Sequence, residues 1–313
     1  MRTFLVTGGA GFIGSHIVEA LLARGDRVRI LDNFSTGHHA NIPKNDRVEV
    51  VEGCVTNEAI VARAVKGVDC IFHEAALASV PRSIEAPLDT NAACVTGTVT
   101  MLNEAQKAGV RRLVYAASSS AYGDKLTSSK RESDLAAPLS PYAAAKLAGE
   151  FYCQAFAHSF GIETVAIRYF NVFGPRQDPN SPYSAVIPLF VTAMLAGRAP
   201  MIYGDGGQSR DFTFVGNVVQ GNLLAADAPN ASGQVFNVAN GRSTTLLELI
   251  RLLNEYLGTK VQPVFQPARV GDVRESLADI SEARRGLAYE PQVDFEEGLR
   301  RTIAYYRETA GKK

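Results

Sequence analysis

The first half of the chain alternates between short apolar runs of strand length and longer amphipathic stretches of helical period. The apolar runs lie at 4–7, 28–32, 48–52, 71–74, 113–117 and 164–169. The helical stretches lie between them, at 12–23, 58–65, 89–108 and 140–160. Strands that alternate with helices in this way pair in parallel and are joined by right-handed crossovers. We therefore expect a doubly wound α/β fold, with helices on both faces of a parallel sheet.

The alternation weakens after residue 171. Turn-rich stretches at 174–180 and 204–207 interrupt it, and helical patterns follow at 246–257 and 295–307. No low-complexity linker separates the two halves, so a cleft rather than a flexible hinge is expected between them. The sequence predicts a sheet domain over 1–170 and a smaller C-terminal α/β lobe over 171–313. We expect part of that second half, about 212–240, to return to the sheet.

Composition narrows the class of protein. The 313 residues are 46% hydrophobic and 20% charged, which predicts a packed core rather than disorder. The formal net charge of 0 argues against a nucleic-acid partner or an anionic membrane surface and favours a small ligand. No apolar run reaches the length of a membrane span, which is about 18 residues. We therefore expect no membrane association and a cytoplasmic location.

The cysteines indicate a reducing compartment. Cys54, Cys70, Cys94 and Cys153 are far apart, and none belongs to a Cys-x-x-Cys pair. This spacing predicts neither a disulfide framework nor a metal site.

A glycine-rich turn follows the first predicted strand directly and opens the first predicted helix. Gly8 allows a tight turn, Gly11 lets the backbone approach a pyrophosphate, and Gly14 brings helix and strand close together. The unpaired N–H groups at the start of a helix are suited to bind an anion. The turn therefore predicts a dinucleotide site, although glycines in this pattern can also serve helix packing alone.

Asp32 ends the second predicted strand, about 20 residues after the glycines, where a carboxylate can accept both ribose hydroxyls of adenosine. Its charge would repel a 2′-phosphate, and Asn33 and Phe34 follow it instead of an arginine. This pattern favours NAD over NADP. The alternative is that Asp32 is only a turn residue.

A second group of polar residues follows the strand at 113–117. Ser118 stands at its carboxyl end, and Tyr142 and Lys146 lie four apart at the start of a predicted helix. Because four residues make about one helical turn, phenol and ammonium share a face. The ammonium would lower the pKa of the phenol, so that it could take a proton from a sugar hydroxyl while the serine completes a relay. Alone, the same spacing also fits a core aromatic beside a solvated lysine.

Together these motifs resemble the extended short-chain dehydrogenase/reductase family, and within it the nucleotide-sugar 4-epimerases. The resemblance covers almost the whole chain and rests on segments 7–15, 73–76, 118–123, 140–146, 168–174 and 204–211. Segments 76–83 and 176–180 are similar to the branch that interconverts UDP-N-acetylglucosamine and UDP-N-acetylgalactosamine. The resemblance implies a Rossmann domain, tightly bound NAD and a homodimer.

In that family Tyr142 would be the acid/base, Lys146 would hold the nicotinamide ribose, and Ser118 would share the substrate hydroxyl. The implied cycle moves the C4 proton to Tyr142 and the C4 hydride to NAD, lets the 4-keto sugar turn over, and returns the hydride to its other face. There is no net redox change, so the cofactor is a temporary store.

The resemblance also implies a set of cofactor contacts. These are Gly8, Gly11, Phe12, Ile13, Gly14, Asp32, Asn33, Ser35, Thr36, Gly37, Cys54, Val55, Ala75, Ala76, Ala78, Cys94, Tyr142, Lys146 and Tyr169. Three of them depart from the family pattern. Cys54 replaces an aspartate that holds the adenine amino group, Cys94 replaces an asparagine, and Ala78 replaces a glycine. We expect looser NAD binding from the first of these.

The implied substrate contacts lie in both halves of the chain. They are Ser79, Val80, Arg82, Ser118, Ser119, Ser120, Asn171, Gln177, Ala185, Val186, Tyr203, Arg210, Arg269, Asp272 and Ser276. Arginines at 210, 269 and 274 are candidates for the diphosphate, and Asp272 resembles the family's uridine-ribose carboxylate.

Two of these positions bear on the reaction and its substrate. Ser120 stands where related dehydratases and decarboxylases carry an acid, which argues for simple epimerisation. Ser276 stands where strict glucose/galactose enzymes carry a tyrosine, so a 2-acetamido group has room. Because a large pocket rejects an undersized ligand only weakly, UDP-glucose and UDP-galactose are expected as well. Ser276 could instead be a surface turn residue.

Two other functions stay open. A UDP-glucuronic acid 4-epimerase or decarboxylase would need a cation for the carboxylate, and Arg82 or Arg176 could supply it. A non-catalytic NAD-binding scaffold would have lost Ser118, Tyr142 and Lys146, which are all present.

For the homodimer, the resemblance implies a seam along the helices at 89–108 and 140–160. Its apolar candidates also suit the sheet's own core, and they are Val99, Leu102, Ala105, Leu147, Phe151 and Phe156.

Overall fold

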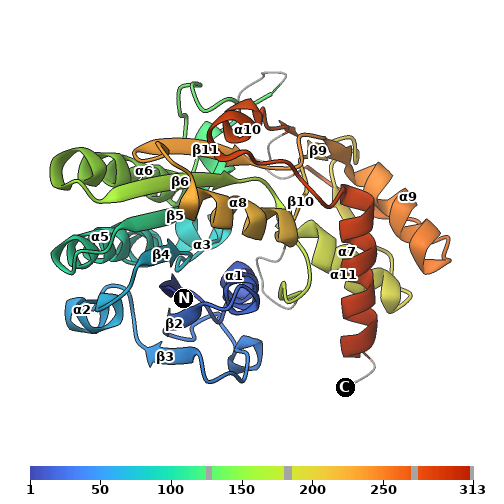
Figure 1. Cartoon of the computed structure of the whole chain (residues 1–313). Helices are drawn as coiled ribbons and strands as arrows, with labels where there is room; N and C mark the ends of the chain where they lie inside the picture. The colour runs from blue at the N-terminus through green and yellow to red at the C-terminus, as the bar shows by residue number, and fades with distance from the viewer. Residues whose placement is uncertain (125–128, 180–184, 269–273, 311–313) are drawn as a thin grey trace.

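In the computed structural model, a seven-stranded sheet forms the larger part of the molecule (Figure 1). The description covers all residues except 125–128, 180–184, 269–273 and 311–313. All neighbouring strands of this sheet run parallel, in the order β11-β6-β5-β4-β1-β2-β3. Their bounds are β1 Thr3–Thr7, β2 Arg27–Asp32, β3 Val48–Glu52, β4 Cys70–His73, β5 Arg112–Ser118, β6 Glu163–Tyr169 and β11 Gln234–Val238. The doubly wound α/β prediction is confirmed.

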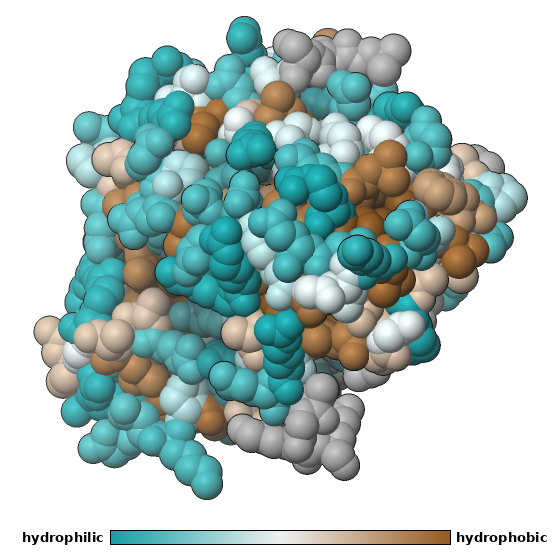
Figure 2. Space-filling model, turned by 90° about the vertical axis from the view of Figure 1, so that its right-hand side faces the viewer, coloured by the Kyte–Doolittle hydropathy of each residue, from teal (hydrophilic) through white to brown (hydrophobic). Residues whose placement is uncertain are grey.

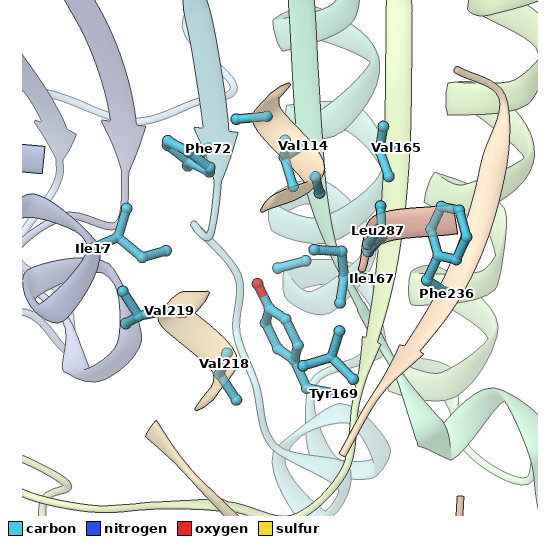
Figure 3. Packing of buried hydrophobic residues seen from close by; sticks show 14 of the residues in the cluster. Ile17, Phe72, Val114, Val165, Ile167, Tyr169, Val218, Val219, Phe236 and Leu287 are labelled. Carbon is cyan, nitrogen blue, oxygen red and sulfur yellow. The ribbon is translucent and has the colours of Figure 1, made fainter. Parts of the chain in front are cut away.

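Helices cover both faces of the sheet (Figure 1). One face carries α1 Phe12–Ala23, α8 Val215–Asp227 and α10 Ser281–Leu287; the other carries α2 Glu58–Val65, α5 Gly97–Lys107 and α6 Pro141–Phe160. Each face buries its own apolar cluster. Figure 3 shows the first cluster, in which Tyr169 lies among aliphatic and aromatic side chains.

The predicted helix at 89–108 is segmented. It comprises α4 Pro87–Asn91, a π-helical stretch at Ala92–Thr96 and α5, and it is preceded by the short helix α3 Val80–Glu85. Pro81 and Pro87 each stand in the first turn of their helix, where a missing N–H costs nothing. Local π geometry inside a helix places an extra residue in one turn and is frequent near functional sites. Here the stretch carries Cys94.

The order in which strands are added to the sheet reverses at β1. β2 and β3 lie on one side of β1, and β4, β5, β6 and β11 lie on the other. The connections after β1 and after β4 therefore diverge and leave a crevice at the carboxyl ends of the strands. Both predicted clusters of chemistry, the glycine turn and Ser118, follow strands at this edge.

The C-terminal part adds a smaller lobe beside the carboxyl edge. It contains the paired strands β8 Met201–Tyr203 with β13 Val264–Gln266, and β9 Ser209–Arg210 between β12 Thr244–Thr245 and β14 Glu275–Ser276. Its helices are α7 Val186–Leu195, α9 Leu246–Leu257 and α11 Phe295–Ala310. β7 Val172–Phe173 pairs with β10 Thr213–Phe214, after which the chain forms α8 and β11.

The lobe has its own aromatic core. Phe173 packs against Phe212, Phe214 and Phe295 with ring centroids 5.5–6.4 Å apart. Asp211 lies nearby, and its carboxylate accepts backbone N–H groups of Asn240, Gly241 and Ala278. One side chain therefore ties the segments around β9, β12 and β14 together. Figure 2 shows the outer face of this lobe, where hydrophobic side chains gather among hydrophilic ones.

The described residues also bear on membrane spans, disulfides and metal sites. Among the helices of the described residues, none is long and apolar enough to cross a membrane. The four cysteines are free thiols, of which only Cys54 is not fully buried. Within the described part of the chain, no group of three or more His, Cys, Asp or Glu side chains is placed to hold a metal.

Candidate active site

The glycine turn between β1 and α1 has the geometry of an anion site. Gly8 adopts φ +66°, and a Cβ at Gly14 would lie 2.2 Å from the Gly8 carbonyl oxygen, so neither position tolerates a side chain. Gly11 precedes the first residue of α1 and offers no side-chain cap. The N–H groups of the first turn are therefore open to a ligand oxygen. These features fit the pyrophosphate of a dinucleotide.

Asp32 lies at the carboxyl end of β2 and is buried. Its two carboxylate oxygens accept the backbone N–H groups of Ala10 and Phe34, each at 2.9 Å. The carboxylate is therefore held beside the glycine turn, and it lines the same cleft. Each oxygen retains a lone pair for a ribose hydroxyl, which fits the adenosine half of NAD.

A cleft of about 700 Å³ runs along the carboxyl edge from the turn toward the smaller lobe. Most of the predicted cofactor residues line it: Gly8, Gly11, Phe12, Ile13, Gly14, Asp32, Asn33, Ser35, Thr36, Cys54, Val55, Ala75, Ala76 and Ala78. Four predicted substrate residues line it as well: Ser79, Arg82, Gln177 and Ala185. The remaining predicted cofactor residues are not among those that line this cleft: Gly37, Cys94, Tyr142, Lys146 and Tyr169.

Sequence reasoning missed several residues of this cleft. They are Leu31, His38, Asn41, Gly53, Glu74, Leu77, Ala93 and Asp178. Arg176, expected from the sequence only as a cation for a substrate carboxylate, lines the cleft as well. Most of the missed residues are immediate neighbours of residues in the recognised motifs, and that adjacency was the available signal. His38 and Asn41 are exceptions, because they enter through the short helix His39–Asn41, which no motif marks.

Ser118, Tyr142 and Lys146 come together beside β5. Ser118 is the last residue of β5, and its Oγ lies 2.8 Å from Ser120 Oγ. The Ser118 hydroxyl lies close enough to the Tyr142 phenol to lower its pKa. The α6 helix begins at Pro141, capped by the Ser140 hydroxyl, which accepts the Ala143 N–H. This cap satisfies a free N–H at the start of the helix; Tyr142 lies in the first turn and Lys146 one turn later.

The electrostatics of the pair differ from the sequence prediction. Burial raises the pKa of Tyr142 above its ordinary value, and the nearby Ser118 hydroxyl opposes this only in part. The Lys146 ammonium donates to the Ala116 carbonyl at 2.7 Å and lies 5.0 Å from the Tyr115 ring centroid. Burial lowers the pKa of Lys146. In the protein alone, therefore, Lys146 does not bring the phenol toward neutrality, because its charge is directed at Ala116.

Asn171 and Ser276 form a second polar group, where the segment after β6 contacts β14 of the smaller lobe. The Asn171 side-chain N–H donates to the Ser276 hydroxyl at 3.4 Å, although the two residues are 105 positions apart. Asn171 adopts φ +34°, a conformation that asparagine tolerates better than most residues. Ser276 pairs with Arg210 in the parallel β14–β9 contact. The structure thus places the predicted wall residue beside two other predicted substrate residues.

Among the described residues, two of the candidate arginines already bind other side chains of the protein, and a third does not. Arg274 forms a bidentate surface ion pair with Asp205, at 3.2 and 3.1 Å. Arg176 is bound to Glu19 and to the Ser15 hydroxyl. Arg82 lines the cleft, and its guanidinium forms no ion pair or hydrogen bond with the described residues. Arg269 and Asp272 lie outside the described residues.

A second cleft of about 750 Å³ adjoins the first through His38, Asn41, Arg176, Gln177 and Asp178. Tyr203 lines it, together with residues of α7 and α11. The Gln177 amide donates to the Val172 carbonyl at 3.1 Å, while its buried oxygen has no hydrogen-bond partner among the residues that the structure describes. The remaining predicted substrate residues, Val80, Ser119, Ser120 and Val186, lie at the starts of the short helices α3, Ser119–Tyr122 and α7.

Comparison with known proteins identifies the family. The sequence model of the NAD dependent epimerase/dehydratase family matches residues 4–239. The UDP-glucose 4-epimerase of Mycolicibacterium smegmatis is 38% identical over 312 residues, which cover 98% of this chain and 99% of that protein. The chain therefore belongs to the NAD dependent epimerase/dehydratase family.

Solved structures agree with this assignment. A UDP-N-acetylglucosamine 4-epimerase from Methanobrevibacter ruminantium, in complex with UDP-N-acetylmuramic acid, matches with a TM-score of 0.95 and 39% identity, covering 98% of this chain and 99% of that one. A variant UDP-glucuronic acid 4-epimerase from Bacillus cereus, with NAD and a fluorinated UDP-glucuronic acid, matches at 0.92 and 30%, with the same coverage. The chain is an extended short-chain dehydrogenase/reductase, and NAD is its cofactor.

Proposed function

We propose that this enzyme interconverts the C4 epimers of UDP-hexoses. Its substrates are UDP-N-acetylglucosamine and UDP-N-acetylgalactosamine, together with UDP-glucose and UDP-galactose. The observation that carries the proposal is that Ser118 and Tyr142 meet at the end of β5, and that Tyr142 and Lys146 act on Glu74, which lines the dinucleotide cleft. The named relatives include epimerases of both kinds of sugar.

When bound, NAD takes up a hydride from C4 of the sugar and gives it back. In the proposed mechanism, Tyr142 removes the proton of the C4 hydroxyl through its phenol oxygen and later returns it. Ser118 holds that hydroxyl by a hydrogen bond, and Ser120 in turn hydrogen-bonds Ser118. Lys146 would hold the cofactor's ribose. Its ammonium donates to the Ala116 carbonyl in the protein alone, so it would favour the phenolate only after turning from that carbonyl toward Tyr142. Gly8, Gly11 and Asp32 hold the rest of the cofactor.

Ser276 is the residue proposed to let the enzyme accept both acetylated and plain UDP-hexoses. Its small side chain and its hydrogen bond with Asn171 leave two polar groups where a 2-acetamido group needs room and partners. Arg210 stands in the neighbouring strand, where it is proposed to meet the diphosphate. A small wall residue admits the larger sugar without excluding the smaller one.

UDP-glucuronic acid is the second candidate substrate, and the placement of Arg82 favours it. A guanidinium that lines a cleft and has no partner in the described part of the chain is suited to a carboxylate, whereas Arg176 is already engaged by Glu19. A relative that binds this class of sugar is among the matching structures. Only epimerisation is proposed for it, because Ser120 provides no acid for a decarboxylation.

We also propose that two copies associate through α6 and the neighbouring helices. Leu102 and Ala105 are fully buried in the core, so the seam cannot use them. Phe151 on α6 is 59% exposed, and Leu88 on α4, which packs against α6, is 83% exposed. Sedimentation of the protein at micromolar concentration should therefore give a dimer, and a monomer would contradict the proposal.

The direct test of the proposed function is proton NMR of the purified protein with UDP-N-acetylglucosamine, UDP-glucose and UDP-glucuronic acid, each in a separate tube with NAD and no reductant. Each C4 epimer has its own anomeric signal. Conversion of the acetylated sugar and of UDP-glucose is expected. Conversion of UDP-glucuronic acid alone would move the assignment to the second candidate, and conversion of none would contradict C4 epimerisation.

A further inference from the structure

Glu74 is a carboxyl group in the wall of the nucleotide cleft to which the proposed mechanism gives no role. It follows the last residue of β4, and its backbone N–H donates to the Thr7 carbonyl at the end of β1. The next residue, Ala75, donates to the Thr7 hydroxyl at 3.1 Å. Because both bonds tie it to the strand that precedes the glycine turn, the side chain starts from a fixed point at the centre of the carboxyl edge.

A buried hydrogen-bond chain orients this carboxyl. The Tyr169 hydroxyl donates to Glu74 Oε1 at 2.7 Å. The same hydroxyl accepts an N–H from Asn222 at 2.8 Å, and Asn222 donates its other N–H to the Val218 carbonyl at 2.9 Å. Glu74 Oε2 has no hydrogen-bond partner among the described residues. One oxygen of a residue that lines the cleft is thus held by the protein, and the other remains available to a ligand.

Among the described groups that act on the Glu74 carboxyl, only Lys146 is a cation. From α6, the Lys146 ammonium and the Tyr142 phenol act on it, and from β6 the Tyr169 phenol does. Burial raises the pKa of both phenols, so they are neutral. His73, on the same strand, is neutral because burial lowers its pKa to about 3. The Cys94 thiol from the π-helical stretch lies near Tyr142 and Lys146.

We propose that Glu74 is the counter-charge of the bound nicotinamide: its carboxylate, held by Tyr169 next to Tyr142 and Lys146, stabilises the oxidised cofactor relative to the reduced one. The oxidised ring carries a positive charge and the reduced ring carries none, so a nearby carboxylate acts on one and not on the other. The inference rests on the proposed placing of Tyr142 and Lys146 at the nicotinamide end. Its benefit to an epimerase is direct, because a less stable reduced cofactor returns its hydride to the keto sugar before the sugar escapes.

This role makes the cofactor's redox balance depend on pH. Burial raises the pKa of Glu74 to about 7. Above pH 7 the carboxylate is ionised and favours NAD over NADH, and below pH 7 it becomes protonated and the preference is lost. The hydrogen bond from Tyr169 lowers the pKa of Glu74, opposing part of the burial effect. Removing that hydroxyl should therefore move the transition to higher pH.

The test measures the dissociation constants of NAD and NADH for the cofactor-stripped enzyme, by calorimetry and by NADH fluorescence, at pH 5.5 and 8.5. In Glu74→Gln, which keeps an acceptor for Tyr169, the ratio of the NAD constant to the NADH constant should rise about tenfold at pH 8.5 and stay unchanged at pH 5.5. Asp46→Asn, in an exposed turn, is the matched control and should leave the ratio unchanged. Tyr169→Phe should shift the midpoint of the pH dependence upward.

Two outcomes would overturn the proposal. An unchanged ratio in Glu74→Gln at pH 8.5 would show that the carboxylate does not act on the nicotinamide. An equal loss of affinity for both cofactor forms would show that its role is structural. Lys146→Met tests the premise separately, since loss of a positive charge there should lower the ratio. No change in that variant would reject the placing of the nicotinamide end, whatever Glu74→Gln shows.

Discussion

The side chains of Asn171 and Ser276 meet across the contact between the large sheet and the smaller lobe, with the amide nitrogen of Asn171 3.4 Å from the hydroxyl oxygen of Ser276. Asn171 follows β6 of the large sheet, and Ser276 ends β14 of the small one. The hydrogen bond therefore bridges the two parts of the molecule at the place where the proposed sugar pocket needs a wall.

Replacing this wall residue should change the choice of substrate. In Ser276→Tyr, the added ring occupies the space of a 2-acetamido group, so kcat/KM for UDP-N-acetylglucosamine should fall by about tenfold or more while that for UDP-glucose is retained. The conversion of both sugars is followed by NMR. Ser276→Ala is the control, because it removes the partner of Asn171 without adding volume, and both activities should persist. Equal retention of both activities in Ser276→Tyr would show that another wall sets the preference.

Tyr142→Phe should remove most of the epimerisation but leave the fold and the bound NAD intact. The phenol oxygen is the proposed proton carrier, and general acid–base groups contribute about 100-fold to 10,000-fold to rates. Turnover is measured by NMR, and bound cofactor by the absorbance of the protein-free extract. Tyr152→Phe, on the exposed side of the same helix, should behave as the unmodified enzyme. A Tyr142→Phe enzyme within about tenfold of normal turnover would contradict the mechanism.

The helix that carries Tyr142 and Lys146 is anchored by a buried ion pair. Arg168 on β6 donates two hydrogen bonds to Glu150 on α6, at 3.0 and 2.7 Å. Their side chains are only 6% and 2% exposed, so removing one partner leaves the other charge buried and unpaired. Arg168→Met should therefore lower the free energy of unfolding by about 3–5 kcal/mol, as measured by urea denaturation.

The matched control for this pair is the double variant Arg168→Met with Glu150→Leu. It removes both charges, so much of the lost stability should return. If the single variant unfolds within about 1 kcal/mol of the unmodified protein, the pair does not anchor α6 in the way described.

His73 should make the protein sensitive to acid. It is fully buried, with its ring nitrogens 2.8 Å from Thr7 Oγ1 and 3.1 Å from Thr98 Oγ1. Burial lowers its pKa from 6.5 to about 3. Because the unfolded chain binds the proton more readily, this contribution to stability is complete above pH 6.5 and is lost as the pH falls from 6.5 toward 3. The slope is about 1.4 kcal/mol per pH unit.

The measurement is urea denaturation of the unmodified protein and of His73→Gln across that pH range. The slope of the unfolding free energy against pH should be smaller in the variant by about 1.4 kcal/mol per pH unit, which corresponds to one proton. This holds whatever the variant's stability at neutral pH. His158→Gln, at an exposed position of α6, should keep the full slope. Parallel curves for His73→Gln and the unmodified protein would contradict a neutral buried His73.

The fold class and the outline of the cofactor site could be predicted because they depend on the periodicity and spacing of residues close together in the sequence. Strand and helix periods gave α1, α2, β3 and α9 at the bounds that the structure has. The glycine turn and Asp32 need only a strand, a helix and a fixed spacing, and any chain that folds this way brings them together. Tyr142 and Lys146 share a helix face for the same local reason.

The groups that specialise this enzyme depend instead on contacts between distant parts of the chain. Glu74 meets Tyr169 across 95 residues, and Ser276 meets Asn171 across 105. No period or spacing encodes these meetings, since they follow from the order of strands in the sheet and from the seating of the smaller lobe. Leu102 illustrates the same limit, because an apolar helical position fits a dimer seam or a core equally well, and packing against the sheet buried it in the core. Periodicity specifies which side of an element is apolar, and tertiary packing determines what that side contacts.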